Sequence, residues 1–369
     1  YAARHSHAPL ITRLVSANAE INVRDGTGRT ALHYAVMRDN EASIRALFGA
    51  FADALIGDSS GKIPLHYAAA LGLPHTANLL LALFGVPQQL QATSSSRNTA
   101  LHFASYHGSL AVVRTLLEKK ASVNVENDDG CTALHFAVVR GNTRIAESLI
   151  QCLSLVNSLD ARGISPLHRS LLAMHSECTE LLLTHSANVN HCDSNLETPL
   201  HWAIGTGSRQ SVGMLLSAGA NMRAESKEHL TPLQQATKLG LVECMEQLLR
   251  RGVAVTQRSR ETGESPLHTA ARFGRSETLS ILLPETSAVH CDEQRERYLE
   301  VRDRAGNTPM HIAAQYNNAD FMRLLALRGA DIQALNDRNE TPMHLACDAG
   351  SHDAVQLLVE LCAESSAVD

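Results

Sequence analysis

The stretch Glu197-Thr198-Pro199-Leu200-His201-Trp202-Ala203 organises the chain, because the rest of the sequence is close to a set of copies of it. Its centre recurs as a tetrad of Thr, Ser or Ile, then Pro or Ala, then Leu or Met, then His or Gln. Successive tetrads are 33, 36, 33, 33, 33, 33, 34, 43 and 33 residues apart by subtraction of their last positions. Self-similarity at such a period predicts a stacked repeat array. The ten tetrads end at His33, His66, His102, His135, His168, His201, Gln234, His268, His311 and His344.

Each unit carries the local signals for two helices. In the stretch 25–30 a glycine can take positive φ at a turn, and Thr30 can cap the helix that follows. Proline after the capping residue fits the first helical position, which has no N–H partner to lose. Second helices show the apolar spacing of a buried face, as in the stretch 112–117. We therefore expect a turn, a short helix, a Gly or polar break, a second helix and a loop in every unit.

These repeats resemble the ankyrin repeat family, whose signature is a unit of about 33 residues that carries T-P-L-H-x-A. The chain repeats it at Thr198–Ala203, Thr308–Ala313 and Thr341–Ala346. The resemblance implies an all-α ankyrin-repeat solenoid of helix-turn-helix units with β-hairpin-like loops. We expect one array over residues 1–369, with ten full repeats and an N-terminal partial repeat at 1–24.

Several departures from the period carry their own expectations. The three extra residues near Gln88 to Ser96 predict a longer hairpin loop, and Leu171-Leu172-Ala173-Met174 predicts a more apolar joint. The charged insertion at 284–300 is either a solvated loop or a specific contact on the binding face. The chain opens inside a repeat, and the predicted second helix Val355–Cys362 stays apolar. We therefore expect further chain, a partner or an end-to-end contact to cover one or both ends; the alternative is an imperfect cap that the array tolerates.

Composition narrows the classes of function. The formal net charge of −6 and the aromatic content of 4% argue against nucleic-acid binding, which needs a basic stripe with stacking platforms. No apolar run approaches the roughly 18 residues that span a bilayer. The 8 cysteines form no C-x-x-C pair and indicate reduced thiols in a cytoplasmic or possibly nuclear protein.

The 19 histidines do not predict a metal site. Nine of them end tetrads, and the resemblance implies that these are structural, held by hydrogen bonds that link neighbouring units. Helices about 8–10 Å apart cannot share a zinc ion whose Zn–N distance is about 2 Å. No phosphate-binding loop occurs, and no nucleophile converges with a base and an orienting group. We expect neither cofactor nor catalysis.

The residues that distinguish this chain from other repeat arrays are expected on its surface, where a partner could bind. Members of the family usually bind protein partners on the concave side, built from hairpin tips and the exposed ends of first helices. Aromatic and arginine side chains are the usual hot spots of interfaces. Trp202, in contrast, is expected to lie in the core. The predicted partner-binding residues are Arg38, Tyr106, His107, Asp128, Asp129, Arg140, Arg272, Phe273, Arg304, Gln315, Tyr316 and Arg338.

Two interpretations of function follow. The first is a protein-interaction scaffold that binds a partner protein or peptide, with an acidic tip at Asp128 and Asp129 and arginines on later tips such as Arg304 and Arg338. The second is a recognition or regulatory arm of a larger enzyme or membrane channel. The resemblance also suggests hydroxylation of the loop asparagines Asn22, Asn124 and Asn190.

Overall fold

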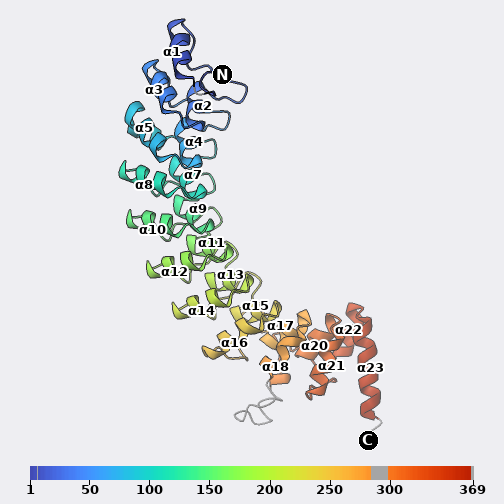
Figure 1. Ribbon diagram of the computed structural model, residues 1–369. Coiled ribbons are helices and arrows are strands. Elements are labelled where there is room, and N and C mark those ends of the chain that lie inside the picture. Colours follow the sequence, from blue (N-terminus) through green and yellow to red (C-terminus); the bar gives the residue numbers. More distant parts are fainter. Residues whose placement is uncertain (6, 284–297, 367–369) are drawn as a thin grey trace. The chain divides into compact units, whose positions relative to one another are not determined.

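The computed structural model describes residues 1–5, 7–283 and 298–366, which contain helices, turns and loops but no β-strand (Figure 1). Contacts divide the chain into two compact units, Tyr1–Asn188 and Val189–Asp369. Each unit is a stack of helix pairs in which one layer holds the first helices and the other the second helices. The prediction of an all-α array of paired helices is confirmed.

In the first unit, every tetrad opens a first helix. Figure 1 shows these helices and the hairpin loops on one side of the unit and the second helices on the other. The first helices are α2 (Ala31–Met37), α4 (Pro64–Leu71), α7 (Ala100–His107), α9 (Ala133–Val139) and α11 (Pro166–Leu172). The second helices are α1 (Ala8–Ser16), α3 (Glu41–Gly49), α5 (Pro74–Phe84), α8 (Leu110–Glu118), α10 (Thr143–Gln151) and α12 (Ser176–Thr184).

The second unit repeats this order. Its first helices are α13 (Pro199–Gly205), α15 (Pro232–Lys238), α17 (Pro266–Phe273), α20 (Pro309–Gln315) and α22 (Pro342–Ala349). Its second helices are α14 (Arg209–Ser217), α16 (Val242–Arg250), the 3₁₀ turn η1 (Ser276–Thr278) with α18 (Leu279–Leu282), α21 (Ala319–Leu327) and α23 (His352–Ser366). The second helix predicted over Val355–Cys362 is confirmed as part of α23.

The tetrad histidine both starts its helix and joins it to the next repeat. The backbone N–H of Thr132 donates to His135 Nδ1 at 3.1 Å, and His135 Nε2 lies 3.2 Å from the carbonyl oxygen of Ile164. Because a backbone N–H can only donate, Nδ1 is the acceptor and the ring proton lies on Nε2. The predicted structural role of these histidines is confirmed. The same Nε2–carbonyl link joins His33 to Lys62, His66 to Ala92, His102 to Cys131, His201 to Leu230, His268 to Asn307 and His311 to Glu340.

Successive hairpin tips are also hydrogen-bonded through their backbones. The N–H of Ala161 donates to the carbonyl of Asp129 at 2.8 Å, and equivalent bonds join other pairs of successive hairpins within each unit. Gly130, at φ +73°, allows this approach, since a Cβ there would lie 2.8 Å from the Ala161 nitrogen. The other tip bonds are Ser59 to Thr27, Ser95 to Ser60, Asp128 to Ser96, Lys227 to Asn195, Arg304 to Thr262 and Asp337 to Ala305.

Asparagines in the loops between the second helices and the next hairpins form a second series of hydrogen bonds between repeats. Asn124 accepts from the N–H of Leu155 at 2.8 Å and donates to the carbonyl of Leu153 at 3.2 Å. Asn22 and Asn190 accept equivalent backbone bonds from the following repeat. The side-chain amides at the three predicted hydroxylation positions are thus used in joining repeats, and the modification itself stays a prediction.

Two loop predictions are wrong in detail. The polar stretch near Gln88 begins with the helix α6 (Val86–Gln91), because Pro87 suits a first turn and the buried Gln89 side chain donates to the carbonyls of Leu80 and Gly85. The joint at 171–174 is not apolar as a whole. Leu171 is buried, but Leu172 and Met174 are exposed, because Met174 takes the left-handed conformation (φ +58°) that glycine takes at this place in other repeats.

Replacing Met174 by glycine should stabilise the array. A left-handed conformation costs an L-residue about 1–2 kcal/mol, and the side chain, 61% exposed, has little packing to lose. Part of this gain in stability is lost again, because glycine gives the unfolded chain more conformational entropy to lose on folding. We expect Met174→Gly to raise the free energy of unfolding by about 0.5–1 kcal/mol in urea titrations. Ala173→Gly, at φ −79°, is the matched control and should lower it; equal losses in both variants would contradict the strain at Met174.

Most of the charged insertion predicted at 284–300 lies outside the described residues. Where the description resumes, Tyr298 is buried and its hydroxyl donates to the carbonyl of Val255 at 2.6 Å. Burial raises the pKa of this phenol above its ordinary value. Tyr298 therefore ties the end of the insertion to the loop after α16.

Candidate functional site

The hairpin face of each unit is the surface formed by the hairpin tips, the residues directly after the tetrads and the C-terminal ends of the first helices. All twelve predicted partner-binding residues lie on it. Arg38, Tyr106, His107 and Arg140 end first helices of the first unit, as Arg272, Phe273, Gln315 and Tyr316 do in the second. Asp128, Asp129, Arg304 and Arg338 are exposed at hairpin tips. Arg272 is the half-buried member of the set; the other eleven are exposed.

A hairpin aspartate orients the side chain that follows the tetrad. Asp58 accepts backbone N–H bonds from Ser60 and Lys62 through Oδ1, and the Tyr67 hydroxyl donates to its Oδ2 at 2.6 Å. Burial alone would raise the pKa of this carboxyl, but these hydrogen bonds together hold it below its ordinary value. The same nine-residue step links Asp25 to Tyr34, Asp160 to Arg169 and Asp193 to Trp202.

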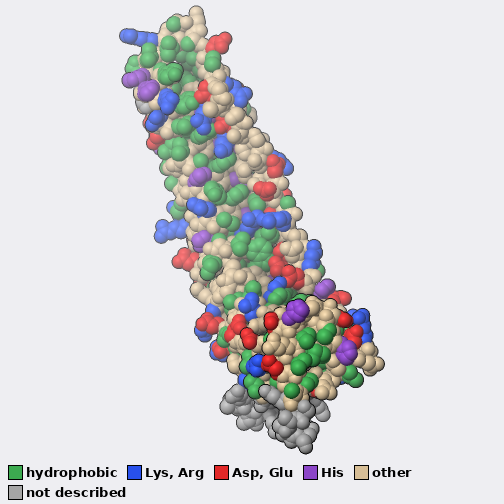
Figure 2. Space-filling model, turned by 90° about the vertical axis from the view of Figure 1, so that its right-hand side faces the viewer, with side chains coloured by type: hydrophobic (Ala, Val, Ile, Leu, Met, Phe, Trp, Pro, Cys, Tyr) green, Lys and Arg blue, Asp and Glu red, His purple; other side chains and the backbone are tan. Residues whose placement is uncertain are grey.

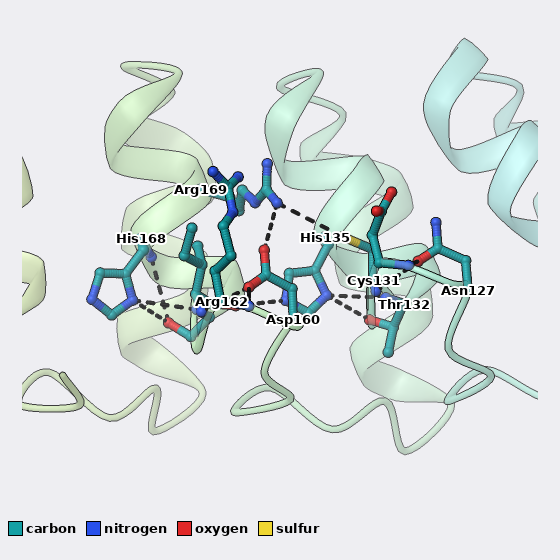
Figure 3. A network of polar contacts seen from close by, with 11 residues as sticks. Asn127, Cys131, Thr132, His135, Asp160, Arg162, His168 and Arg169 are labelled. Carbon is teal, nitrogen blue, oxygen red and sulfur yellow. Dashed lines mark hydrogen bonds and ion pairs between the residues drawn. The ribbon is translucent and has the colours of Figure 1, made fainter. Parts of the chain in front are cut away.

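Figure 3 shows the version of this arrangement in which the oriented side chain is a cation. Arg169 lies 2.5 Å from the Asp160 Oδ2 atom, and its guanidinium also lies 3.8 Å from the Cys131 sulfur of the preceding repeat. Asp160 Oδ1 accepts the backbone N–H groups of Arg162 and Ile164. This carboxylate, 2% exposed, is therefore shared between the turn and the helix. Burial raises the thiol pKa of Cys131, so it is a poor nucleophile.

The prediction that Trp202 lies in the core is wrong. Trp202 is half-buried, as are Tyr34, Tyr67, Phe103 and Phe136 in the same place, and its indole N–H donates to Asp193 at 3.1 Å. This slot contributes to the hairpin face, since its side chain leans over the hairpin rather than between the helix layers. The sequence held a signal for it: Arg169 and Gln235 occupy the same slot, and a core position would not accept them.

On the first unit, three cations lie over aromatic rings of a neighbouring repeat. The Arg29 guanidinium carbon is 5.4 Å from the Tyr67 ring centroid, and Arg29 Nε donates to the Tyr67 hydroxyl at 3.0 Å. Lys62 Nζ is 5.2 Å from the Phe103 centroid, and the Arg140 guanidinium carbon is 5.1 Å from that of Tyr106. We call these six residues the cation–aromatic row. Figure 2 shows hydrophobic and Lys or Arg side chains interspersed on the side to which the hairpins of this unit point.

Among the described residues of the second unit there are two such pairs, and both include a carboxylate. Lys238 Nζ is 5.3 Å from the Phe273 centroid and 2.6 Å from a Glu228 oxygen. Arg272 lies 5.0 Å over Tyr316 and is ion-paired with Glu264. Although Arg272 was predicted as a free binding residue, much of its hydrogen-bonding capacity is used within the fold. Sequence reasoning missed this because the partner lies eight residues away, in the hairpin.

A basic hollow lies between two loops of the second unit. Its volume is about 300 Å³, and its lining includes Arg223, Arg258, Arg260 and Glu225. Glu225 accepts the backbone N–H of Arg260 at 2.8 Å and the Ser259 hydroxyl at 3.2 Å. The three arginines of the hollow are therefore gathered beside a structural carboxylate, whose negative charge opposes theirs.

Neither a cluster of metal ligands nor a membrane-spanning helix occurs among the described residues. In residues 1–5, 7–283 and 298–366 no three His, Cys, Asp or Glu side chains are grouped as metal ligands. Within the same residues, none of the helices combines the length and apolar composition needed to cross a bilayer. The hairpin face is built from hydrogen-bonded, aromatic and charged side chains.

Comparisons with known proteins agree with this architecture. A family model described as "Ankyrin repeats (3 copies)" matches residues 1–92, 76–160, 141–226, 219–295 and 290–369. Among solved structures, the ankyrin repeat domain of Bcl-3, described as a unique member of the IkappaB protein family, is similar with a TM-score of 0.54. That match has 29% sequence identity and covers 60% of this chain and 99% of the Bcl-3 domain. The family model covers the whole chain, so the protein belongs to the ankyrin repeat family.

Proposed function

We propose that this array is a protein-recognition scaffold that binds a partner protein or peptide on its hairpin face. One observation carries the proposal: partly exposed aromatic rings with a cation beside them are concentrated on this face. Tyr106, Phe273 and Tyr316 are 42%, 39% and 46% exposed, and each has a Lys or Arg group within 5.3 Å of its ring centroid. Tyr and Arg are the side chains most enriched among interface hot spots.

The remaining predicted residues extend this surface. His107 packs edge-on against Tyr106, with ring centroids 5.2 Å apart. Arg38, Gln315, Arg304 and Arg338 add polar groups around the aromatic centres, as in the polar rim of an interface. Asp128 and Asp129 place an acidic tip between the cations of the first unit. We propose that these residues contact the partner and that Arg272 acts mainly by positioning Tyr316.

Site-specific photo-crosslinking tests the proposal. A photoreactive amino acid at Tyr106 or Gln315 on the hairpin face is compared with one at Glu118 or Asp320, which are exposed on second helices. We expect partner crosslinks from a cell extract mainly at the hairpin-face positions. The double variant Tyr106→Ala with Phe273→Ala should weaken capture about tenfold or more, as loss of interface hot spots does. Equal crosslinking from the second helices would place the partner elsewhere.

A further inference from the structure

The cation–aromatic row of the first unit lacks the carboxylates that accompany the same kind of pair in the second unit. Within the described residues of the first unit, ion pairs join Arg45 and His75 to Glu41, and Arg169 to Asp160. No described carboxylate oxygen lies within 4.0 Å of the charged groups of Arg29, Lys62 or Arg140. Lys238 and Arg272 each have such a partner. The three cations of the row are therefore oriented by rings and form no ion pair with a described carboxylate.

The carboxylates of the hairpins before α2 and α4, Asp25 and Asp58, already have other partners. Asp25 accepts from the Tyr34 hydroxyl at 2.5 Å, and Asp58 accepts from the Tyr67 hydroxyl at 2.6 Å. Their other oxygens accept backbone N–H groups of the turns. Side-chain hydrogen bonds from Tyr34 and Thr27 hold the pKa of Asp25 well below its ordinary value. These aspartates stay ionised within their turns and make no direct ion pair with the row.

The electrostatic effect of these cations on a neighbouring histidine is consistent with their lack of ion pairs. His107, beside Tyr106, has a pKa lowered first by burial and then by the positive charges of Arg140 and Lys62. The positive charges of Lys62 and Arg140 thus reach a side chain at the end of α7. An anionic group placed on this face would meet donors that are held in place by the rings, while Arg29 already donates its Nε–H to the Tyr67 hydroxyl.

We infer that the cation–aromatic row binds an extended peptide segment of the partner protein that carries aspartate or glutamate at about every third residue. The inference rests on the proposed function and specifies the chemistry of the partner. Each cation would receive one carboxylate, in the way that Glu228 and Glu264 serve Lys238 and Arg272 in the second unit. The rings of Tyr67, Phe103 and Tyr106 would receive the apolar atoms between the acids.

The spacing of the row fits such a segment. Arg29 lies at the junction of α2 and α4, Lys62 at the junction of α4 and α7, and Arg140 at the junction of α7 and α9. Packed helices are about 8–10 Å apart. An extended chain rises about 3.3 Å per residue, so three residues span about 10 Å. In such a segment the distance between successive acids therefore matches the distance between successive helix junctions.

The test is fluorescence anisotropy with the full chain and a labelled peptide of about ten residues, with glutamate at every third position and threonine or valine between. We expect this peptide to bind about tenfold or more tightly than its glutamine counterpart. The triple variant Arg29→Gln, Lys62→Gln and Arg140→Gln should abolish that preference. Lys62→Gln alone removes no side-chain hydrogen bond among the described residues and should give a smaller loss even if the triple variant unfolds.

The matched control removes the same charge from second helices. Arg13→Gln, Arg114→Gln and Arg144→Gln change exposed residues of α1, α8 and α10 and should leave the preference intact. Equal affinity for both peptides, or an equal loss in this control, overturns the inference. A single-stranded oligonucleotide that binds more tightly than the peptide, and does so through the row, also overturns it. If the peptide fails while Tyr106 still crosslinks to a protein, only the acid preference is wrong; if both fail, the proposed function is wrong as well.

Discussion

Acidification from about pH 7 to about pH 5 should lower the free energy of unfolding by several kcal/mol, because buried tetrad histidines must stay neutral in the fold. Burial lowers the pKa of His66, His135, His201 and His268 from 6.5 to about 4. Between these two values the unfolded chain binds more protons than the folded one, so stability falls as the pH falls. The loss is roughly 2 kcal/mol per histidine over this range.

One repeat of the chain shows which substitution can test this explanation. Gln234 occupies the tetrad position without a titratable group: it accepts from the N–H of Thr231 at 2.9 Å and donates to the carbonyl of Glu264 at 2.8 Å. His135→Gln should therefore keep both links and lose roughly 2 kcal/mol less than the parent between these pH values. Urea unfolding followed by circular dichroism measures the difference. The exposed His185→Gln should behave as the parent does, and the same slope in all three proteins would refute the buried-histidine explanation.

Among the described residues, three carboxyl groups shift the stability in the opposite direction. Burial raises the pKa of Glu197, Glu264 and Glu300 above 4.5, so their protonation favours the folded state as the pH falls. Burial also lowers the pKa of His33, His102 and His311, and these histidines add to the loss. The histidines outnumber the opposing carboxyl groups, and we expect the net slope to keep the sign set by the histidines.

Leu134→Asp should unfold the centre of the first unit and leave the second unit folded. Leu134 in α9 is fully buried, and a carboxylate there would have no partner, at a cost of about 5 kcal/mol or more. Helix α9 packs against α7, α10 and α11, so the damage begins in these neighbours. Repeat arrays are stabilised by nearest-neighbour interfaces, which lets one stretch unfold alone.

Hydrogen exchange read by mass spectrometry locates the loss. Protection should fall first in α7 to α11 and persist in α13 to α23. Leu155→Asp introduces the same charge at a residue that is 60% exposed and should change protection little. Uniform loss of protection over both units would mean that the chain unfolds as one body, and the nearest-neighbour account would fail.

The sequence predicts the helices well because every repeat states the same local rule. Each tetrad supplies a capping residue, usually a proline at the first turn, and a histidine that ties the helix to the next hairpin. The tetrad occurs ten times, so one departure from it, such as Gln234, does not hide the pattern. The predictions of an apolar joint at 171–174 and of a loop near Gln88 were wrong in detail. Met174 takes a left-handed conformation and is exposed, and the side-chain bonds of Gln89 support a helix where a loop was expected.

The hairpin face is less predictable, because its pairs join residues far apart in the sequence. Its position follows from the repeat, but whether an arginine is free depends on a second side chain. Lys62 meets Phe103 and carries no carboxylate, whereas Arg272 meets both Tyr316 and Glu264. Each pair combines positions from two repeats, and the period alone says nothing about which residues occupy them.

The shared pairs of the hairpin face have a consequence for how such a chain can evolve. Tyr67 receives its cation from the repeat before it, and Phe103 receives Lys62 in the same way. The tip bonds and the histidine links, in contrast, run through backbone carbonyls and are indifferent to most side chains. Duplication or exchange of one repeat would therefore preserve the connections that hold the array together while creating new pairs at both of its borders. Recombination between repeats can therefore change the side chains of the hairpin face while the hydrogen bonds that stabilise the fold are kept.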